Sequence, residues 1–269
     1  IGVFQLESPN MRLLMKALAP TSFDDVAALV ALYRPGPMAA NMHHDYADRK
    51  NGRKPITYDH PDLEPILADT QGLMIYQESV MRVAQKFAGY SLEEADNLRK
   101  ACGKKDRDLI AKEREKFVAG CDKEGYGVEL GTSLFDVIEP FADYAFNKSH
   151  SYGYGLVAYQ TAWLKAHFPV EYLSALLTSV KDDKDKTAVY LSECRSQGIE
   201  VVVPDVNRSY SDFAPRVGEA EKPGILFGLS AVRNVGENLV ERIVEEREAN
   251  GHFVDFFDFC RRVDTMVLN

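Results

Sequence analysis

Capped helical segments separated by proline and glycine make up most of the chain and favour a mainly helical fold. Ser8-Pro9 is a typical helix start, and apolar residues recur after it at helical spacing. Thr21 or Ser22 caps a second segment, which the proline-rich residues 34–37 end. Further helices are expected near residues 75–90, 91–103, 106–125, 129–142, 151–167, 169–180 and 184–197.

The sequence pattern changes after Gly198. Three short segments rich in β-branched or apolar residues predict strands at 199–203, 213–217 and 225–228. The following stretch, GLSAVRNVGENLVERIVEER, predicts a helix, a tight turn and a second helix. We therefore expect a helical domain over residues 1–197 and a small α+β segment with a helix-hairpin-helix-like element over residues 198–269.

The segment FNKSHSYGYGLVAYQ, residues 146–160, carries polar side chains directly into an apolar, aromatic helix. A helix start leaves backbone N–H groups unpaired and carries the positive end of the helix dipole, which favours a phosphate. Lys148 adds a positive charge and His150 a flat ring that forms hydrogen bonds. The alternative is that Asn147 and Ser149 simply cap an ordinary buried helix.

A second basic cluster lies between Arg99 and Arg107, where five basic residues accompany one acid, although the net charge of the chain is −9. Arg offers a bidentate fork to phosphate oxygens and Lys a mobile charge, so Arg99 and Lys100 can flank an extended triphosphate. The alternative is a solvated cationic helix end, which the helix dipole also favours.

Six short motifs follow one another along nearly the whole chain. They are FQLES (4–8), ALYRPGP (31–37), YQE (76–78), ADNLRKACGKK (95–105), FNKSHS (146–151) and YQTAWLKAHFP (159–169). In this order they resemble the fingers region of the alpha subunit of bacterial DNA polymerase III, the C-family replicative polymerase.

The resemblance implies a nucleotide site in the helical part. It places Arg99 and Lys100 against the triphosphate of the incoming deoxynucleoside triphosphate (dNTP), and His150 where it crowds the ribose 2′ side. It implies a pocket around the base and sugar made by Asn147, Lys148, Ser149, His150 and Tyr154.

Other residues have weaker roles by the same resemblance. Arg34 and Gln77 could contact the template or nucleotide, or could belong to a rigid helix stop and a capped helix. From the residues themselves, those expected to attract the DNA backbone are Lys104, Lys105, Arg107, Arg233, Asn234 and Gly236, although the first three could serve only solubility. The last three form a hairpin turn that would hold a phosphate without reading bases, or would be a purely structural helix pair. Asn234 stands where the usual motif has glycine.

Two-metal nucleotidyl transfer needs acidic ligands on a rigid platform. The chain offers only Asp24-Asp25 and Asp183-x-Asp185, neither on a convincing strand. The resemblance implies that the catalytic carboxylates and their Mg²⁺ ions belong to the palm, outside this chain. Because the chain begins with Ile1 rather than Met, we expect a piece of a longer protein. Because the resemblance places the catalytic carboxylates elsewhere, we expect this piece to have no catalytic residue and to be inactive alone.

The resemblance implies template–primer DNA and dNTP as ligands, with the sliding clamp and other replisome subunits reached through the complete protein. No apolar run of membrane-spanning length and no signal peptide occur, so we expect a cytoplasmic protein without a membrane partner. The four cysteines lie far apart and predict neither a zinc site nor disulfides.

Two other functions remain open from the residues. One is a DNA-binding module that is not part of an enzyme, built on the hairpin and the basic helix. The other is a metal-dependent hydrolase using His43, His44, Asp45, Asp48 and His60, although a complete ligand set is not evident.

Overall fold

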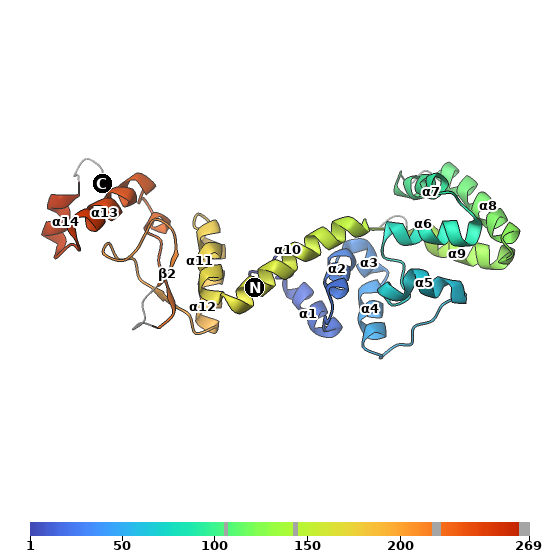
Figure 1. Ribbon diagram of the computed structural model, residues 1–269, viewed down its shortest axis with the longest axis horizontal. Coiled ribbons are helices and arrows are strands. Elements are labelled where there is room, and N and C mark those ends of the chain that lie inside the picture. Colours follow the sequence, from blue (N-terminus) through green and yellow to red (C-terminus); the bar gives the residue numbers. More distant parts are fainter. Residues whose placement is uncertain (105–106, 142–144, 217–221, 264–269) are drawn as a thin grey trace. The chain divides into compact units, whose positions relative to one another are not determined.

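The structure is a computed structural model that describes residues 1–104, 107–141, 145–216 and 222–263, without the side chains of residues 102–104 and 107. The chain forms two compact units (Figure 1). One contains residues 5–159, and the other contains residues 1–4 and 160–269. The predicted mainly helical class is confirmed, since the described residues form helices and one small sheet.

The unit of residues 5–159 begins with the helices α1 (Pro9–Leu18), α2 (Phe23–Leu32), α3 (Pro35–Ala39) and α4 (Met42–Lys50). The hydroxyl of Ser8 caps α1, as predicted. Ser22 rather than Thr21 caps α2, in a reciprocal capping box with Asp25. The proline-rich residues after α2 end that helix but also start α3, because proline suits the first position of a helix.

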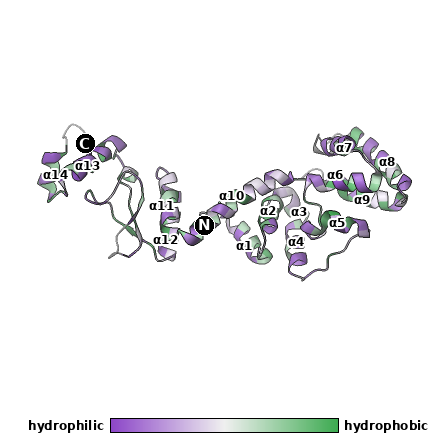
Figure 2. Ribbon diagram, in the orientation of Figure 1, coloured by the Kyte–Doolittle hydropathy of each residue, from purple (hydrophilic) through white to green (hydrophobic). Residues whose placement is uncertain are grey.

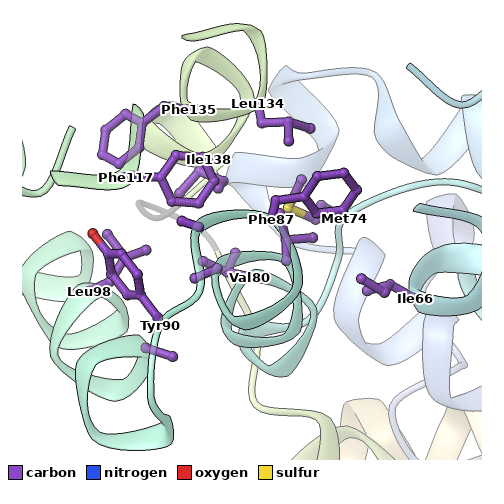
Figure 3. Packing of buried hydrophobic residues seen from close by; sticks show 14 of the residues in the cluster. Ile66, Met74, Val80, Phe87, Tyr90, Leu98, Phe117, Leu134, Phe135 and Ile138 are labelled. Carbon is purple, nitrogen blue, oxygen red and sulfur yellow. The ribbon is translucent and has the colours of Figure 1, made fainter. Parts of the chain in front are cut away.

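Helices α6 (Gln77–Ala88), α7 (Leu92–Lys104), α8 (Arg107–Lys123) and α9 (Gly127–Phe141) follow the short α5 (Glu64–Leu67) and two 3₁₀ turns, η1 (Pro61–Leu63) and η2 (Ala68–Thr70). Hydrophilic and hydrophobic residues interleave along them (Figure 2), as expected for amphipathic helices. Their apolar faces meet in one core that contains Phe87, Leu98, Phe117, Phe135 and Ile138 (Figure 3).

Helix α10 (Lys148–His167) runs through the division between the two units at residues 159 and 160. We expected this helix near residues 151–167, and that start is wrong, because the helix already begins at Lys148. Asn147 starts it: its side-chain oxygen accepts a hydrogen bond from the backbone N–H of His150 at 2.8 Å, and its carbonyl accepts one from Ser151 at 3.0 Å.

The second unit contains α11 (Pro169–Ser179), α12 (Lys184–Ser196) and a sheet of β1 (Glu200–Val202), β2 (Ala214–Arg216) and β3 (Gly224–Leu226). The strand order is β1-β3-β2, with β3 parallel to β1 and antiparallel to β2. Leu173, Leu177 and Cys194 from the helices share a core with Phe213 and Ile225. The secondary structure therefore changes near residue 198, whereas the compact units divide earlier, because α11 and α12 pack with the sheet. A domain boundary at residue 198 stays a prediction.

The predicted helix before the hairpin turn is only the 3₁₀ turn η3 (Leu229–Ala231), while the second helix is present as α13 (Glu237–Asn250) and is followed by α14 (Phe256–Arg262). Backbone N–H groups of Leu229 and Ser230 donate to the carbonyl oxygens of Tyr210 and Ser211, at 2.8 and 3.1 Å. These tertiary hydrogen bonds replace those of a longer helix.

Among the helices of the described residues, none combines the length and the apolar character that a membrane crossing requires.

Candidate functional site

The starts of α6 and α10 lie side by side in the unit of residues 5–159. Tyr76, directly before α6, and Phe146, two residues before α10, form a parallel β-bridge. The backbone N–H of Gln77 donates to the carbonyl of Phe146 at 2.9 Å, and that of Phe146 donates to the carbonyl of Ile75 at 3.3 Å. Two motifs that are about 70 residues apart in the sequence are thereby held together.

Glu78 occupies the start of α10. Its carboxylate accepts hydrogen bonds from the Asn147 amide and from the backbone N–H of Lys148, both at 2.9 Å. The Lys148 ammonium lies 2.6 Å from the Asp69 carboxylate. The N–H groups of Lys148 and His150, which the sequence led us to expect unpaired, are therefore bonded to protein groups. A carboxylate here satisfies the same helix dipole that would attract a phosphate.

Arg99 and Lys100 share one carboxylate partner. Asp96 lies 2.8 Å from Arg99 Nε and 2.7 Å from Lys100 Nζ. Hydrogen bonds from Lys100 and then from Arg99 lower the pKa of Asp96. Arg99 Nη1 also donates to the side-chain oxygen of Gln77 at 3.4 Å. Arg99 therefore contacts Gln77, and Asn147 contacts Glu78, the next residue of α6.

Aromatic rings connect the other predicted residues of this surface. The Arg34 guanidinium lies 4.5 Å from the centre of the Phe146 ring, and burial lowers the pKa of Arg34. The Phe146 ring meets the His150 ring edge-on at 5.4 Å, and the His150 ring lies 4.4 Å from that of Tyr154. Ser149 donates to the side-chain oxygen of Asn147 at 2.6 Å. The FNKSHS segment and Arg34 of the YRPGP segment thus belong to one surface.

This surface is open to solvent. Five of the predicted residues on it have exposed side chains, namely Lys100, Asn147, Ser149, His150 and Tyr154. A cavity of about 350 Å³ in the same unit has a different lining, which includes Arg49, Tyr58, Met74 and Phe141. The structure therefore brings the predicted residues together as an open face rather than as an enclosed pocket.

Asp69 and Asp96 were missed from the sequence, which drew attention to Glu78 only as part of the YQE motif. Asp69 pairs with Lys148, and Asp96 pairs with Arg99 and Lys100. Glu78 accepts hydrogen bonds from the Asn147 amide and the Lys148 backbone N–H. The signal for Asp96 was available, since acids three and four positions before Arg99 and Lys100 lie on the same helix face. Glu78 and Asp69 act over many residues of sequence separation, so no local pattern indicates them.

The hairpin turn lies in the second unit. Asn234 adopts a left-handed conformation with φ of 65°, which an asparagine tolerates where the usual motif has glycine. Gly236 is the N-cap residue of α13 and makes no side-chain cap. Arg233 and Asn234 belong to the turn between η3 and α13. The side chains of Lys104, Lys105 and Arg107, which we expected to attract DNA, lie outside the described residues.

The acids considered for metal binding have structural partners. Asp25 is buried, accepts the backbone N–H groups of Thr21 and Ser22, and lies 3.4 Å from Lys50. Asp24 accepts a hydrogen bond from the Tyr152 hydroxyl at 2.5 Å. Asp183 caps α12. Within the described ranges, no three His, Cys, Asp or Glu side chains are arranged to hold a metal ion. The acids that the structure describes therefore do not fit a two-metal centre.

Comparison with protein families supports the resemblance inferred from the motifs. Residues 1–125 match the model of the bacterial DNA polymerase III alpha subunit finger domain, and residues 198–269 match a helix-hairpin-helix motif.

Curated relatives match over the whole chain. DNA polymerase III subunit alpha is 54% identical in Mycobacterium leprae, 47% in Pseudomonas aeruginosa and 44% in Escherichia coli K12. Each alignment covers 100% of this chain and 23% of the relative. The chain thus spans about a quarter of the length of these relatives, and it belongs to the family of the bacterial DNA polymerase III alpha subunit.

Proposed function

We propose that this chain is the part of a replicative DNA-directed DNA polymerase that binds the incoming dNTP and positions it on template–primer DNA. The observation that carries the proposal is the convergence of the two basic motifs at the start of α6. Arg99 donates to Gln77, and Asn147 donates to Glu78. A cationic helix and a polar helix start on one open face can bind the two ends of the same nucleotide.

In this proposal Arg99 and Lys100 bind the triphosphate. Asp96 holds both cations in the unbound chain. The incoming phosphates carry more charge than one carboxylate and would replace it as the partner. Side chains with 31% and 55% exposure can make this exchange without opening the core.

Asn147, Ser149, His150 and Tyr154 surround the base and sugar, with Lys148 beside them. The ring contacts between His150, Phe146 and Tyr154 fix the His150 imidazole, which suits a residue that excludes the 2′ hydroxyl of a ribonucleotide. The Arg34 guanidinium packs on the Phe146 ring. We assign it a conformational role in the same surface, with a contact to template or nucleotide by Arg34 or Gln77.

The chemical step belongs to residues outside this chain. Two Mg²⁺ ions would supply the charge stabilisation of nucleotidyl transfer. Asp24, Asp25 and Asp183 are engaged with a tyrosine and with helix caps. The residues of this chain bind and orient the nucleotide.

The DNA contacts are proposed from both units. Lys104, Lys105 and Arg107 would attract the backbone near the nucleotide. Arg233, Asn234 and Gly236 would hold a backbone phosphate at the hairpin turn, as helix-hairpin-helix elements do. The sliding clamp and other replisome subunits would be reached through the complete protein, which we place in the cytoplasm.

Primer extension tests the division of labour. The chain alone should extend no template–primer with dNTPs and Mg²⁺, while a complete alpha subunit that contains this segment should extend it. Extension by purified chain would show that the catalytic carboxylates are within these residues and would contradict the proposal.

A DNA-binding module without enzymatic function is the second candidate, favoured by the helix-hairpin-helix match over residues 198–269. It predicts duplex binding that falls steeply with salt and that does not respond to reversal of the charge at Arg99. The polymerase proposal predicts that Arg99→Glu impairs use of the nucleotide.

A further inference from the structure

The unit of residues 5–159 contains a cavity that the proposed nucleotide face does not use. Its volume is about 350 Å³. The walls come from α4, residues 57–59, η1, α5, the loop at residues 72–74 and α9. Segments far apart in the sequence thus surround one cavity within a single compact unit.

Most of the residues that line this cavity are apolar and belong to the core of the unit. Leu63, Leu67, Met74 and Leu134 are lining residues, and all four are buried. They are members of the core cluster drawn in Figure 3, where Met74 and Leu134 are labelled. Packed interiors contain few voids larger than a water molecule, and cavities that hold small organic ligands have volumes of about 300–1,000 Å³. The size and the apolar walls therefore suit a small ligand with an apolar body.

Arg49 of α4 places a guanidinium in this wall. Its Nη1 donates to the carbonyl oxygen of Gln71 at 3.0 Å, while its Nε is buried and has no hydrogen-bond partner. Among the described residues, no carboxylate forms an ion pair with Arg49. A buried donor without an acceptor is costly, so a ligand that supplies an acceptor oxygen to this guanidinium would be favoured.

Gly72 brings Arg49 and Tyr58 close together. A Cβ at Gly72 would lie 3.0 Å from Arg49 Nη1 and 3.3 Å from Tyr58 Cε1, so both side chains pack over the glycine. Burial raises the pKa of Tyr58, and its hydroxyl therefore stays protonated at neutral pH. A protonated tyrosine beside a guanidinium offers a second donor to the same anion.

The carboxylates near this polar end neutralise Arg49 only weakly. Asp59 lines the cavity and Glu64 lies close to it, and both residues are exposed. Asp48, the residue before Arg49, pairs with Arg53 at 2.7 Å. Water screens exposed charges, whereas charges that are partly buried are screened less. Arg49 thus remains able to bind an anionic group.

We propose that this cavity binds a monocarboxylic acid with an alkyl or aryl body. The carboxylate accepts hydrogen bonds from Arg49 and Tyr58, and the apolar body lies against Leu63, Leu67 and Met74. Charge-assisted hydrogen bonds fix one end, and burial of apolar surface stabilises the other. The described lining contains none of the residues assigned to the nucleotide, so the inference does not rest on the proposed function.

Isothermal titration calorimetry of the purified full chain tests the inference, with 4-phenylbutanoate and its neutral amide, 4-phenylbutanamide, as probes. The acid should bind about tenfold more tightly than the amide, because only the acid forms charge-assisted hydrogen bonds. Arg49→Met keeps a long side chain but removes the guanidinium, so it should weaken binding of the acid about tenfold and binding of the amide much less. Arg12→Met, at an exposed arginine of α1 outside the cavity, is the matched control and should change neither affinity.

Asp59→Asn supplies a second test that leaves Arg49 in place. It removes a carboxylate that repels the acid, so binding of the acid should become tighter while binding of the amide stays the same. Three results would overturn the inference. They are equal affinities of the unchanged chain for acid and amide, an Arg49→Met variant that binds the acid as tightly as the unchanged chain, and no saturable binding of the acid. Circular dichroism checks that each variant is folded. If Arg49→Met does not fold, Asp59→Asn decides, and an unchanged affinity for the acid would then contradict the inference.

Discussion

The side-chain amide of Asn147 donates to the carboxylate of Glu78 at 2.9 Å, across 69 residues of sequence. This bond, with the one from the Lys148 backbone N–H, attaches the start of α10 to the start of α6. In the proposed nucleotide site, Glu78 has the position and charge of a ligand at the helix terminus. The residue therefore both supports the site and competes with an anion for it.

Replacing Glu78 with Gln tests the structural half of this role. The substitution removes a charged acceptor of two hydrogen bonds, so the free energy of unfolding should fall by about 1–2 kcal/mol. Urea denaturation of the full chain measures the change. Glu93→Gln, at an exposed position in the first turn of α7, is the control and should leave the free energy within about 0.5 kcal/mol of the wild-type value. Equal effects of the two variants would show that the Glu78 contacts contribute nothing.

Gly153 and Gly155 offer a matched pair on α10. A Cβ at Gly155 would lie 3.2 Å from the Cα of Ala27 in α2, whereas a Cβ at Gly153 would meet no atom within 4 Å. Gly155→Ala should therefore destabilise the chain by about 1–3 kcal/mol through overpacking. Gly153→Ala should stabilise it by up to about 1 kcal/mol, because alanine is the better helix former.

The same denaturation experiment compares these two glycine variants. If Gly155→Ala is as stable as Gly153→Ala, the close packing of α10 on α2 is not present in solution. The open space at Gly153 also leaves room for a strand or nucleotide, so Gly153→Ala should bind template–primer DNA more weakly despite its greater stability.

The lowered pKa of Glu94 predicts how the stability of the chain depends on pH. Its pKa is lowered from 4.5 to about 2, first by the hydrogen bond from the Ser91 backbone N–H and then by Lys116. Because the folded-state pKa lies below the unfolded value, the stabilisation is present above about pH 4.5 and is lost as the pH falls towards 2. Glu94→Gln should flatten the acid side of the stability curve, as measured by thermal unfolding between pH 2 and pH 6. A curve identical to that of the wild type would contradict the assignment.

Interactions within one helical turn were predictable from the sequence, and those between distant segments were not. The cap at Ser8 was predicted, and the cap of α2 was limited to Thr21 or Ser22, because donor and acceptor lie three residues apart. The pairing of Glu78 with the α10 start joins residues about 70 positions apart, so no local pattern contains it.

The prediction of a helix before the hairpin turn was wrong for a related reason. The residues around Leu229 and Ser230 are compatible with a helix, but the backbone N–H groups of these two residues donate to carbonyl oxygens of residues 210 and 211. Tertiary hydrogen bonds outweighed a propensity difference that is only a few tenths of a kcal/mol per residue. The candidate site was anticipated in its basic and polar residues through the family resemblance. Its acidic partners and its open shape came from the structure.

The central claim is that Arg99 and Asn147 bind the same dNTP, and the apparent KM for dNTP in single-nucleotide incorporation tests it most directly. In a complete alpha subunit carrying this segment, Arg99→Ala and Asn147→Ala should each raise that KM, the first by about tenfold or more. Binding of template–primer DNA should be unchanged, as should the KM of Arg12→Ala, a control at an exposed arginine of α1. A wild-type KM in either test variant, or an equal loss of DNA binding in both, would contradict the account.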